Sequence, residues 1–180
     1  MKISELHFWS YYFDFLAFPV MIFTTILLMF IINMPPLYLL WLSLGLVLWS
    51  LFEYLFHRWG FHRFIFSHSH HLHHVDPAGY IGVPSLITST IYILGICLSL
   101  SIDEPVIATL LVGLSIGYLV YIFVHHQIHH GRLAGRYLDA ARTRHNRHHH
   151  DARCDFGVTV SLWDRIFGTR STSRVTPCPP

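Results

Sequence analysis

The chain has 180 residues, of which 53% are hydrophobic and only 12% charged, against about 25% charged in an average soluble domain. A chain this short and this apolar cannot hide its apolar surface in a soluble core, so we expect an integral membrane protein. The formal net charge of +2 is small, and we expect no nucleic-acid partner.

Four apolar runs dominate the first two thirds of the sequence. They predict transmembrane helices at about 15–32, 37–56, 84–102 and 106–124, each 18–20 residues long. At a rise of about 1.5 Å per residue, each helix spans roughly 30 Å, the thickness of the hydrocarbon core. The alternative, a soluble helical bundle, needs a polar face on each helix, and these runs have almost none.

The linkers predict the topology. Residues 33–36 and 101–105 are too short to cross a membrane, so the four helices form two hairpins with both turns on one side. The histidine-rich regions 57–83 and 125–170 then lie on the other side, together with all twelve Lys and Arg residues. This distribution predicts a cytoplasmic histidine face, in a bacterial inner membrane or the endoplasmic reticulum.

The predicted fold is therefore all-α. It is a single domain over residues 1–180, with four transmembrane helices and a cytoplasmic helical cap that carries the histidines. Residues 171–180 are interpreted as a disordered tail. The segment 156–169 is interpreted as an interfacial anchor in which Asp164 caps a short helix.

The spacing of the sixteen histidines indicates metal ligands. His70, His73 and His74 stand at i, i+3 and i+4, which share one helix face, so three imidazoles can converge on one point. The same spacing recurs later in the chain, and two i, i+4 pairs lie between these triads. The later triad is His145, His148 and His149, and the pairs are His125/His129 and His126/His130.

The two i, i+4 pairs point about 100° apart, so one pair can face a shared site squarely; we favour His125 and His129. His57 and His62 are five residues apart, which is about 140° off a common face of a regular helix. They can share a site where the helix ends or loosens, which Gly60 would permit, or each can bind a different ion.

Ten histidines form the predicted ligand set, enough for two metal ions with four to six ligands each. They are His57, His62, His70, His73, His74, His125, His129, His145, His148 and His149. Glu53, one turn before His57, is expected either to accept a hydrogen bond from a ligand or to form an ion pair with an arginine such as Arg58. Further candidates for contacts to the ligands are His71, His126, His130 and Asp151.

Several motifs resemble the fatty acid hydroxylase superfamily, the membrane-bound histidine-box enzymes that include sterol oxidases and desaturases. The motifs are EYLFHRWGFH at 53–62, HSHHLHH at 68–74, HHQIHH at 125–130, RHNRHHH at 144–150 and FGVTVSLWDRIFGT at 156–169. Their combination is most similar to the fatty acid 2-hydroxylase branch.

The resemblance implies an O2-dependent lipid hydroxylase with two iron ions, whose sites zinc can also occupy. Its substrate would be a membrane lipid, hydroxylated at carbon 2 of a fatty acid or sphingolipid, and no protein group beyond the metal ligands is expected to be catalytic. Larger members carry a fused cytochrome b5 domain, for which residues 1–14 leave no room. We therefore expect a separate electron donor of cytochrome b5 or ferredoxin type with its reductase.

Two alternatives remain at this stage. A sterol, carotenoid or alkane oxidase or desaturase would use the same histidine boxes. A membrane metal transporter or metal-storage protein would also place histidines at helix ends, but a transporter needs ionisable residues along its path. Glu53 is the only charged residue within the four apolar runs, and it lies near an end.

Overall fold

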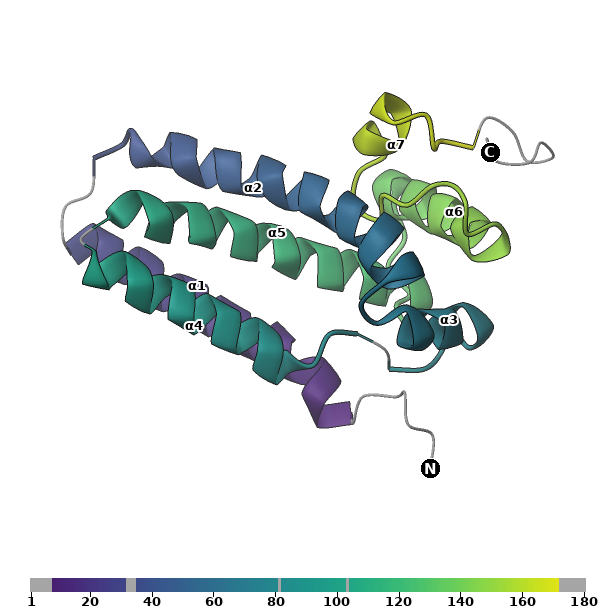
Figure 1. Cartoon of the computed structure of the whole chain (residues 1–180), viewed down its shortest axis with the longest axis horizontal. Coiled ribbons are helices and arrows are strands. Elements are labelled where there is room, and N and C mark those ends of the chain that lie inside the picture. Colours follow the sequence, from purple (N-terminus) through teal and green to yellow (C-terminus); the bar gives the residue numbers. More distant parts are fainter. Residues whose placement is uncertain (1–7, 32–34, 81, 103, 172–180) are drawn as a thin grey trace. The chain divides into compact units, whose positions relative to one another are not determined.

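The computed structural model describes residues 8–31, 35–80, 82–102 and 104–171. The predicted tail beyond residue 171 and the middle of both predicted hairpin linkers lie outside these ranges. Every regular element in the described residues is a helix, which confirms the predicted all-α class (Figure 1). The elements are α1 (Phe8–Ile31), α2 (Tyr38–Leu55), the π-helix η1 (Phe56–Phe61), α3 (Ser67–Val75), α4 (Ser85–Ser101), α5 (Pro105–His129), α6 (Arg136–His150) and α7 (Leu162–Ile166).

The chain divides into two compact units. Among the described residues, the bundle unit comprises residues 8–31, 35–49, 82–102 and 104–120, and the histidine unit comprises residues 50–80 and 121–171. Helices α2 and α5 contribute residues to both units. The bundle unit has a core of Phe18 from α1, Tyr92 from α4 and Val112 from α5, against which Leu42 of α2 packs.

Among the described residues, three helices are long and apolar enough to cross a membrane. They are α1, the continuous helix Tyr38–Phe61 and α5, whereas α4 is also apolar but has only 17 residues. Large apolar side chains face outward along them; Phe30 of α1 and Leu86 of α4 are each 80% exposed. Such surface is stable in lipid and not in water, so the chain is a membrane protein.

Helix α1 begins at Phe8, seven residues before the predicted start. The predicted span starts directly after Asp14, but in the structure the carboxylate of Asp14 is buried within the helix. It accepts hydrogen bonds from the hydroxyl groups of Thr88, at 2.9 and 3.1 Å, and Tyr118. Because these partners satisfy the carboxylate, the helix continues through Asp14, which sequence periodicity does not reveal.

Helices α2 and α5 approach closely at Gly45 and Gly113. A Cβ atom on Gly113 would overlap the carbonyl oxygen of Leu42, and one on Gly45 would overlap that of Leu110. Small residues that let two backbones touch are typical of helix packing in membranes.

We expect Gly113→Ala to destabilise the protein by about 1–3 kcal/mol, because the added methyl group meets rigid backbone. Gly95→Ala is the matched control on α4. Its methyl group would meet the flexible end of the Leu111 side chain at 2.8 Å, and we expect a smaller loss. Thermal unfolding in one detergent compares the two variants, and equal melting temperatures would contradict the close approach.

Candidate metal centre

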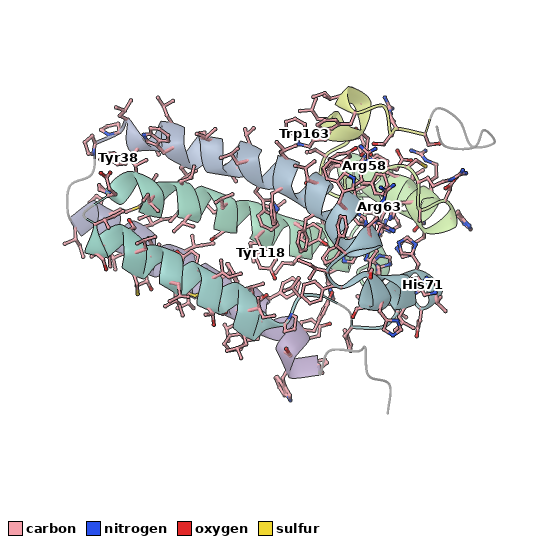
Figure 2. The ribbon with its side chains drawn as sticks, viewed as in Figure 1. Tyr38, Arg58, Arg63, His71, Tyr118 and Trp163 are labelled. Atoms are coloured by element: carbon pink, nitrogen blue, oxygen red, sulfur yellow. The ribbon has the colours of Figure 1, made fainter. Side chains whose placement is uncertain are left out.

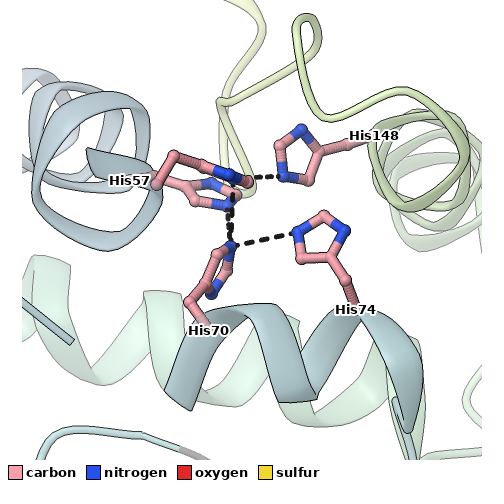
Figure 3. A group of neighbouring side chains, drawn as sticks. His57, His70, His74 and His148 are labelled. Carbon is pink, nitrogen blue, oxygen red and sulfur yellow. Dashed lines mark hydrogen bonds between the residues drawn. The ribbon is translucent and has the colours of Figure 1, made fainter. Parts of the chain in front are cut away.

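Five of the ten predicted ligands form one cluster, here called the first histidine group. One ring nitrogen from each member lies within 4.8 Å of all the others. His70 Nε2 lies 3.0 Å from His57 Nε2 and 3.1 Å from His62 Nε2, and His74 Nε2 lies 3.1 Å from His70 Nε2 (Figure 3). His148 Nε2 is 3.0 Å from His62 Nε2. The group consists of His57, His62, His70, His74 and His148.

These short contacts cannot all be hydrogen bonds. Each imidazole nitrogen carries one proton or one lone pair, so His70 Nε2 cannot satisfy three neighbouring nitrogens. Nitrogens bound to one ion at about 2.0–2.1 Å would lie about 2.8–3.4 Å apart at bond angles of 90–109°. The observed separations of 3.0–3.1 Å fit that arrangement.

Two backbone carbonyl groups fix the tautomers of two members. His57 Nδ1 lies 2.6 Å from the carbonyl oxygen of Phe156, and His148 Nδ1 lies 2.7 Å from that of Cys154. A carbonyl oxygen only accepts, so both Nδ1 atoms carry the proton and donate. Both Nε2 atoms therefore present lone pairs to the centre of the group, as metal ligands require.

A second cluster, the second histidine group, consists of His73, His125, His129 and His145, again with one nitrogen of each within 4.8 Å of the rest. The tenth predicted ligand, His149, lies beside it. His149 Nε2 is 3.1 Å from His145 Nε2, and its ring lies 4.8 Å from that of His73 and 4.4 Å from that of His74.

Neither histidine triad converges on a single point. On α3, His70 and His74 join the first group while His73 joins the second. On α6, His148 joins the first group while His145 joins the second. Residues at i+3 and i+4 diverge by about 100° around a helix, so each short helix contributes to both groups.

His57 and His62 share one group because the chain between them is a π-helix. Helix α2 continues into η1 (Phe56–Phe61), in which i→i+5 bonding widens each turn, and the two rings stack with centroids 5.2 Å apart. The expected loosening is therefore present, but Gly60 contributes in another way. A Cβ on Gly60 would lie 2.9 Å from the ring of Phe56, so the glycine makes room for that side chain.

The predicted ligands on α3 and α6, and His62, are held neutral. Burial, reinforced by neighbouring imidazoles, lowers the pKa of His62 and of His149 to about 4 and that of His73 to about 2. Burial likewise lowers the pKa of His70, His145 and His148. A neutral imidazole is the form that binds metal, so these side chains need lose no proton at neutral pH.

We expect the metal-free protein to lose stability as the pH falls from about 6.5 toward 4. In that window the unfolded chain protonates His62 and His149, whose pKa values in the folded state are about 4, so unfolding takes up protons. Above pH 6.5 this contribution is constant. Thermal unfolding should show a melting temperature at least about 5 °C lower at pH 5 than at pH 7.5; a flat profile would contradict neutral burial.

The hydrogen-bonding state of the buried nitrogens in the second group indicates whether a metal ion fits there. Within the described parts of the chain, both ring nitrogens of His73, Nε2 of His129 and Nδ1 of His145 are buried without a hydrogen-bond partner. Each unsatisfied buried polar atom costs about 1–3 kcal/mol, so several together indicate a ligand. All donors of both groups are imidazole nitrogens, which suit iron, zinc, copper or nickel.

The other candidates, His71, His126, His130 and Asp151, lie outside the two groups, although the ring of His130 lies 6.4 Å from that of His129. His71 is exposed on α3 (Figure 2), and Asp151 accepts hydrogen bonds from Arg153 at 2.8 Å. His126 and His130 lie outside both groups, with their rings 5.2 Å apart and His130 against Tyr80.

Glu53 neither bonds a ligand nor pairs with Arg58. Its Oε1 atom accepts hydrogen bonds from the backbone N–H groups of Val158 and Thr159, both at 2.8 Å. Arg58 instead donates to the hydroxyl group of Tyr54 at 2.9 Å. Acceptors on the backbone carry no sequence signature, and the partners of Glu53 lie over a hundred residues away along the chain.

Comparisons with known proteins agree on one family. Residues 42–169 match the family model described as fatty acid hydroxylase. Fatty acid 2-hydroxylase of Macaca fascicularis is 31% identical over 177 residues, covering 89% of this chain and 48% of the relative. Ceramide very long chain fatty acid hydroxylase scs7 of Schizosaccharomyces pombe is 29% identical, covering 70% of this chain and 41% of the relative.

A solved structure shares the fold. Full-length scs7p, in which only the hydroxylase domain is visible, superimposes with a TM-score of 0.70 at 21% identity, covering 98% of this chain and 71% of that one. The chain spans about half the length of the mammalian fatty acid 2-hydroxylases that it matches.

Proposed function

Because this chain belongs to the fatty acid hydroxylase family, we propose that it is a membrane-bound di-iron oxygenase that hydroxylates the acyl chain of a lipid. The observation that carries the proposal is the pair of all-imidazole groups, each with enough converging nitrogens for one ion. Relatives named for 2-hydroxylation of fatty acids support carbon 2 of a fatty acid or sphingolipid as the site of reaction.

The histidines define what the protein contributes to the reaction. Two iron ions held by these groups would supply redox chemistry with O2 that zinc lacks. His57 and His148 would present fixed lone pairs to the first ion, and His73, His125, His129 and His145 would hold the second. The ring of Phe156 covers the first group, with its centroid 5.3 Å from that of His148, and limits the access of water.

The position of the ligands along the chain supports reaction near the lipid headgroup. His57 of the first group lies just after the end of the apolar helix α2, and His125 and His129 of the second lie in the last turns of α5. A lipid whose tail lies along such apolar helices would place the carbons next to its headgroup nearest the ions. This favours carbon 2 over positions in the middle of the chain.

The overall reaction needs an electron donor. One oxygen atom of O2 enters the C–H bond as a hydroxyl group, and the other leaves as water with two electrons and two protons. We propose that a separate cytochrome b5 or ferredoxin with its reductase supplies the electrons.

Lipid mass spectrometry of cells with and without the protein tests this function. We expect 2-hydroxyacyl lipids to appear with the wild-type chain and to be missing with the double variant His145→Ala/His148→Ala. Hydroxylation deep in the acyl chain would contradict the assignment of carbon 2. Bound metal without any O2 consumption in the presence of reductant and lipid would favour metal storage or transport.

A further inference from the structure

The segment 154–159 supplies the carbonyl groups that hold His57 and His148, so its own support determines how rigid these ligands are. It contains no helix or strand, yet residues 154–159 are all buried. A buried irregular segment must have its backbone polar groups satisfied by other parts of the protein.

Two carboxylate groups bond four consecutive backbone N–H groups of this segment. Asp164 Oδ1 accepts from the N–H of Phe156, and Asp164 Oδ2 from that of Gly157, both at 2.8 Å. Glu53 Oε1 accepts from the next two, Val158 and Thr159. We call this arrangement of Glu53 and Asp164 around residues 156–159 the carboxylate clamp.

Further hydrogen bonds and close packing hold the clamp and the segment that it binds. Asp164 is fully buried and also accepts a hydrogen bond from the Thr169 hydroxyl group at 2.8 Å. A Cβ on Gly157 would overlap the carbonyl oxygen of Val160 and lie 2.8 Å from Asp164 Oδ2, so only glycine fits beneath this carboxylate. The carbonyl group of Thr159 accepts from the Tyr137 hydroxyl group at 3.0 Å.

This role of Asp164 differs from the predicted helix cap. Asp164 stands in the first turn of α7, whose N-cap residue, Ser161, makes no side-chain capping bond. Its carboxylate is instead turned to the chain before the helix. The two residues of the WD pair at 163–164 therefore have different roles. The indole N–H of Trp163 donates to the Ser50 hydroxyl group at 3.0 Å, and the buried carboxylate of Asp164 accepts from the backbone.

We propose that the carboxylate clamp positions His57 as a metal ligand by fixing the Phe156 carbonyl group. The N–H of Phe156 is bonded to Asp164, and its carbonyl oxygen accepts the Nδ1 proton of His57. The clamp thereby holds the ring orientation and the tautomer that turn Nε2 to the first group. The inference rests on the proposed function only in assuming that both histidine groups bind metal.

The clamp acts on the first group. Its loss should therefore weaken the binding of the ion at the first group and leave the binding at the second group unchanged. Asp164→Asn keeps the size of the side chain, but its amide nitrogen cannot accept a hydrogen bond from the Gly157 N–H. Removing a group that orients a metal ligand typically costs about 10–100-fold in metal affinity. A general loss of folding would release both ions together.

Two single-site backgrounds separate these outcomes. His145→Ala retains the first group, and His148→Ala retains the second. Co2+ titrations of the full chain in detergent, followed by visible absorption, measure the affinity in each background with and without Asp164→Asn. We expect about 10–100-fold weaker binding in the His145→Ala background and no change in the His148→Ala background. Asp139→Asn, which removes an exposed carboxylate beside Arg142, is the control and should change neither.

Equal weakening in both backgrounds, or unchanged Co2+ affinity in the His145→Ala background, would overturn the proposal. Where Asp164→Asn does not fold, Glu53→Gln and the milder Thr169→Val provide the same comparison. The titration is independent of turnover: a wild-type protein that binds two ions but hydroxylates nothing refutes the proposed function and leaves the clamp testable. A wild-type protein that binds no ion overturns both.

Discussion

Replacing His148 by alanine is expected to reduce the metal content from two ions per chain to one and to lower hydroxylation by more than about 100-fold. His148 is fully buried, and its Nε2 lone pair faces the first histidine group because Nδ1 donates to the Cys154 carbonyl group. Removing a side chain that only orients a metal ligand lowers metal affinity or activity by about 10–100-fold. Removing a ligand itself should lower activity by more. Elemental analysis per chain and product formation measure the two effects.

His145 and His150 complete this test on the same helix. His145, three residues earlier on α6, belongs to the second group, so His145→Ala should also leave one ion, and the double variant none. His150 is exposed beside His149, and His150→Ala should keep two ions and full activity. Loss of both ions from either single variant would show that the groups do not bind metal separately.

Exchanging iron for zinc is expected to abolish turnover while preserving the fold. Both ions accept imidazole ligands, so each should stabilise the folded protein by about 2.7 kcal/mol when present at a hundred times its dissociation constant. The proposed reaction requires a metal that changes its oxidation state, and zinc has no redox chemistry.

Parallel measurements on one preparation test this exchange. The metal-free protein is loaded with Fe2+ without oxygen or with Zn2+, and its melting temperature and its O2 consumption with reductant and lipid are recorded. We expect both ions to raise the melting temperature and only iron to support O2 consumption. Equal O2 consumption by the zinc-loaded protein would contradict a di-iron mechanism.

Much of the fold follows from the sequence because its signals are local. Apolar runs of bilayer length predict the spanning helices, and histidine spacing indicates which side chains share a helix face. Asp14 shows the limit of this reasoning. Its charge moves the predicted start of the first helix, since the hydroxyl groups of Thr88 and Tyr118 that satisfy it lie more than 70 residues away in the sequence.

The sequence indicates which histidines are candidate ligands but not how they are arranged. Nine of the ten predicted ligands lie in the two groups and His149 lies beside the second, but helix spacing alone allows His73 and His70 to share one point, and the structure places them in different groups. The π-helix that aligns His57 with His62 has no distinct sequence pattern. The sequence also does not predict which backbone carbonyl groups bond the histidines. Every residue has a carbonyl group, and only the folded chain shows which ones face a ligand.

The decisive measurement is the position and the origin of the oxygen atom that the iron-loaded protein inserts into a lipid. The protein is supplied with an N-acyl sphingolipid, a reductase, its electron carrier and isotopically heavy O2, and the product is fragmented in a mass spectrometer. We predict one heavy oxygen atom, carried as a hydroxyl group on carbon 2 of the acyl chain, from protein with two iron ions per chain. An unlabelled hydroxyl group, or turnover by protein that lacks either ion, would contradict a di-iron oxygenase built on the two histidine groups.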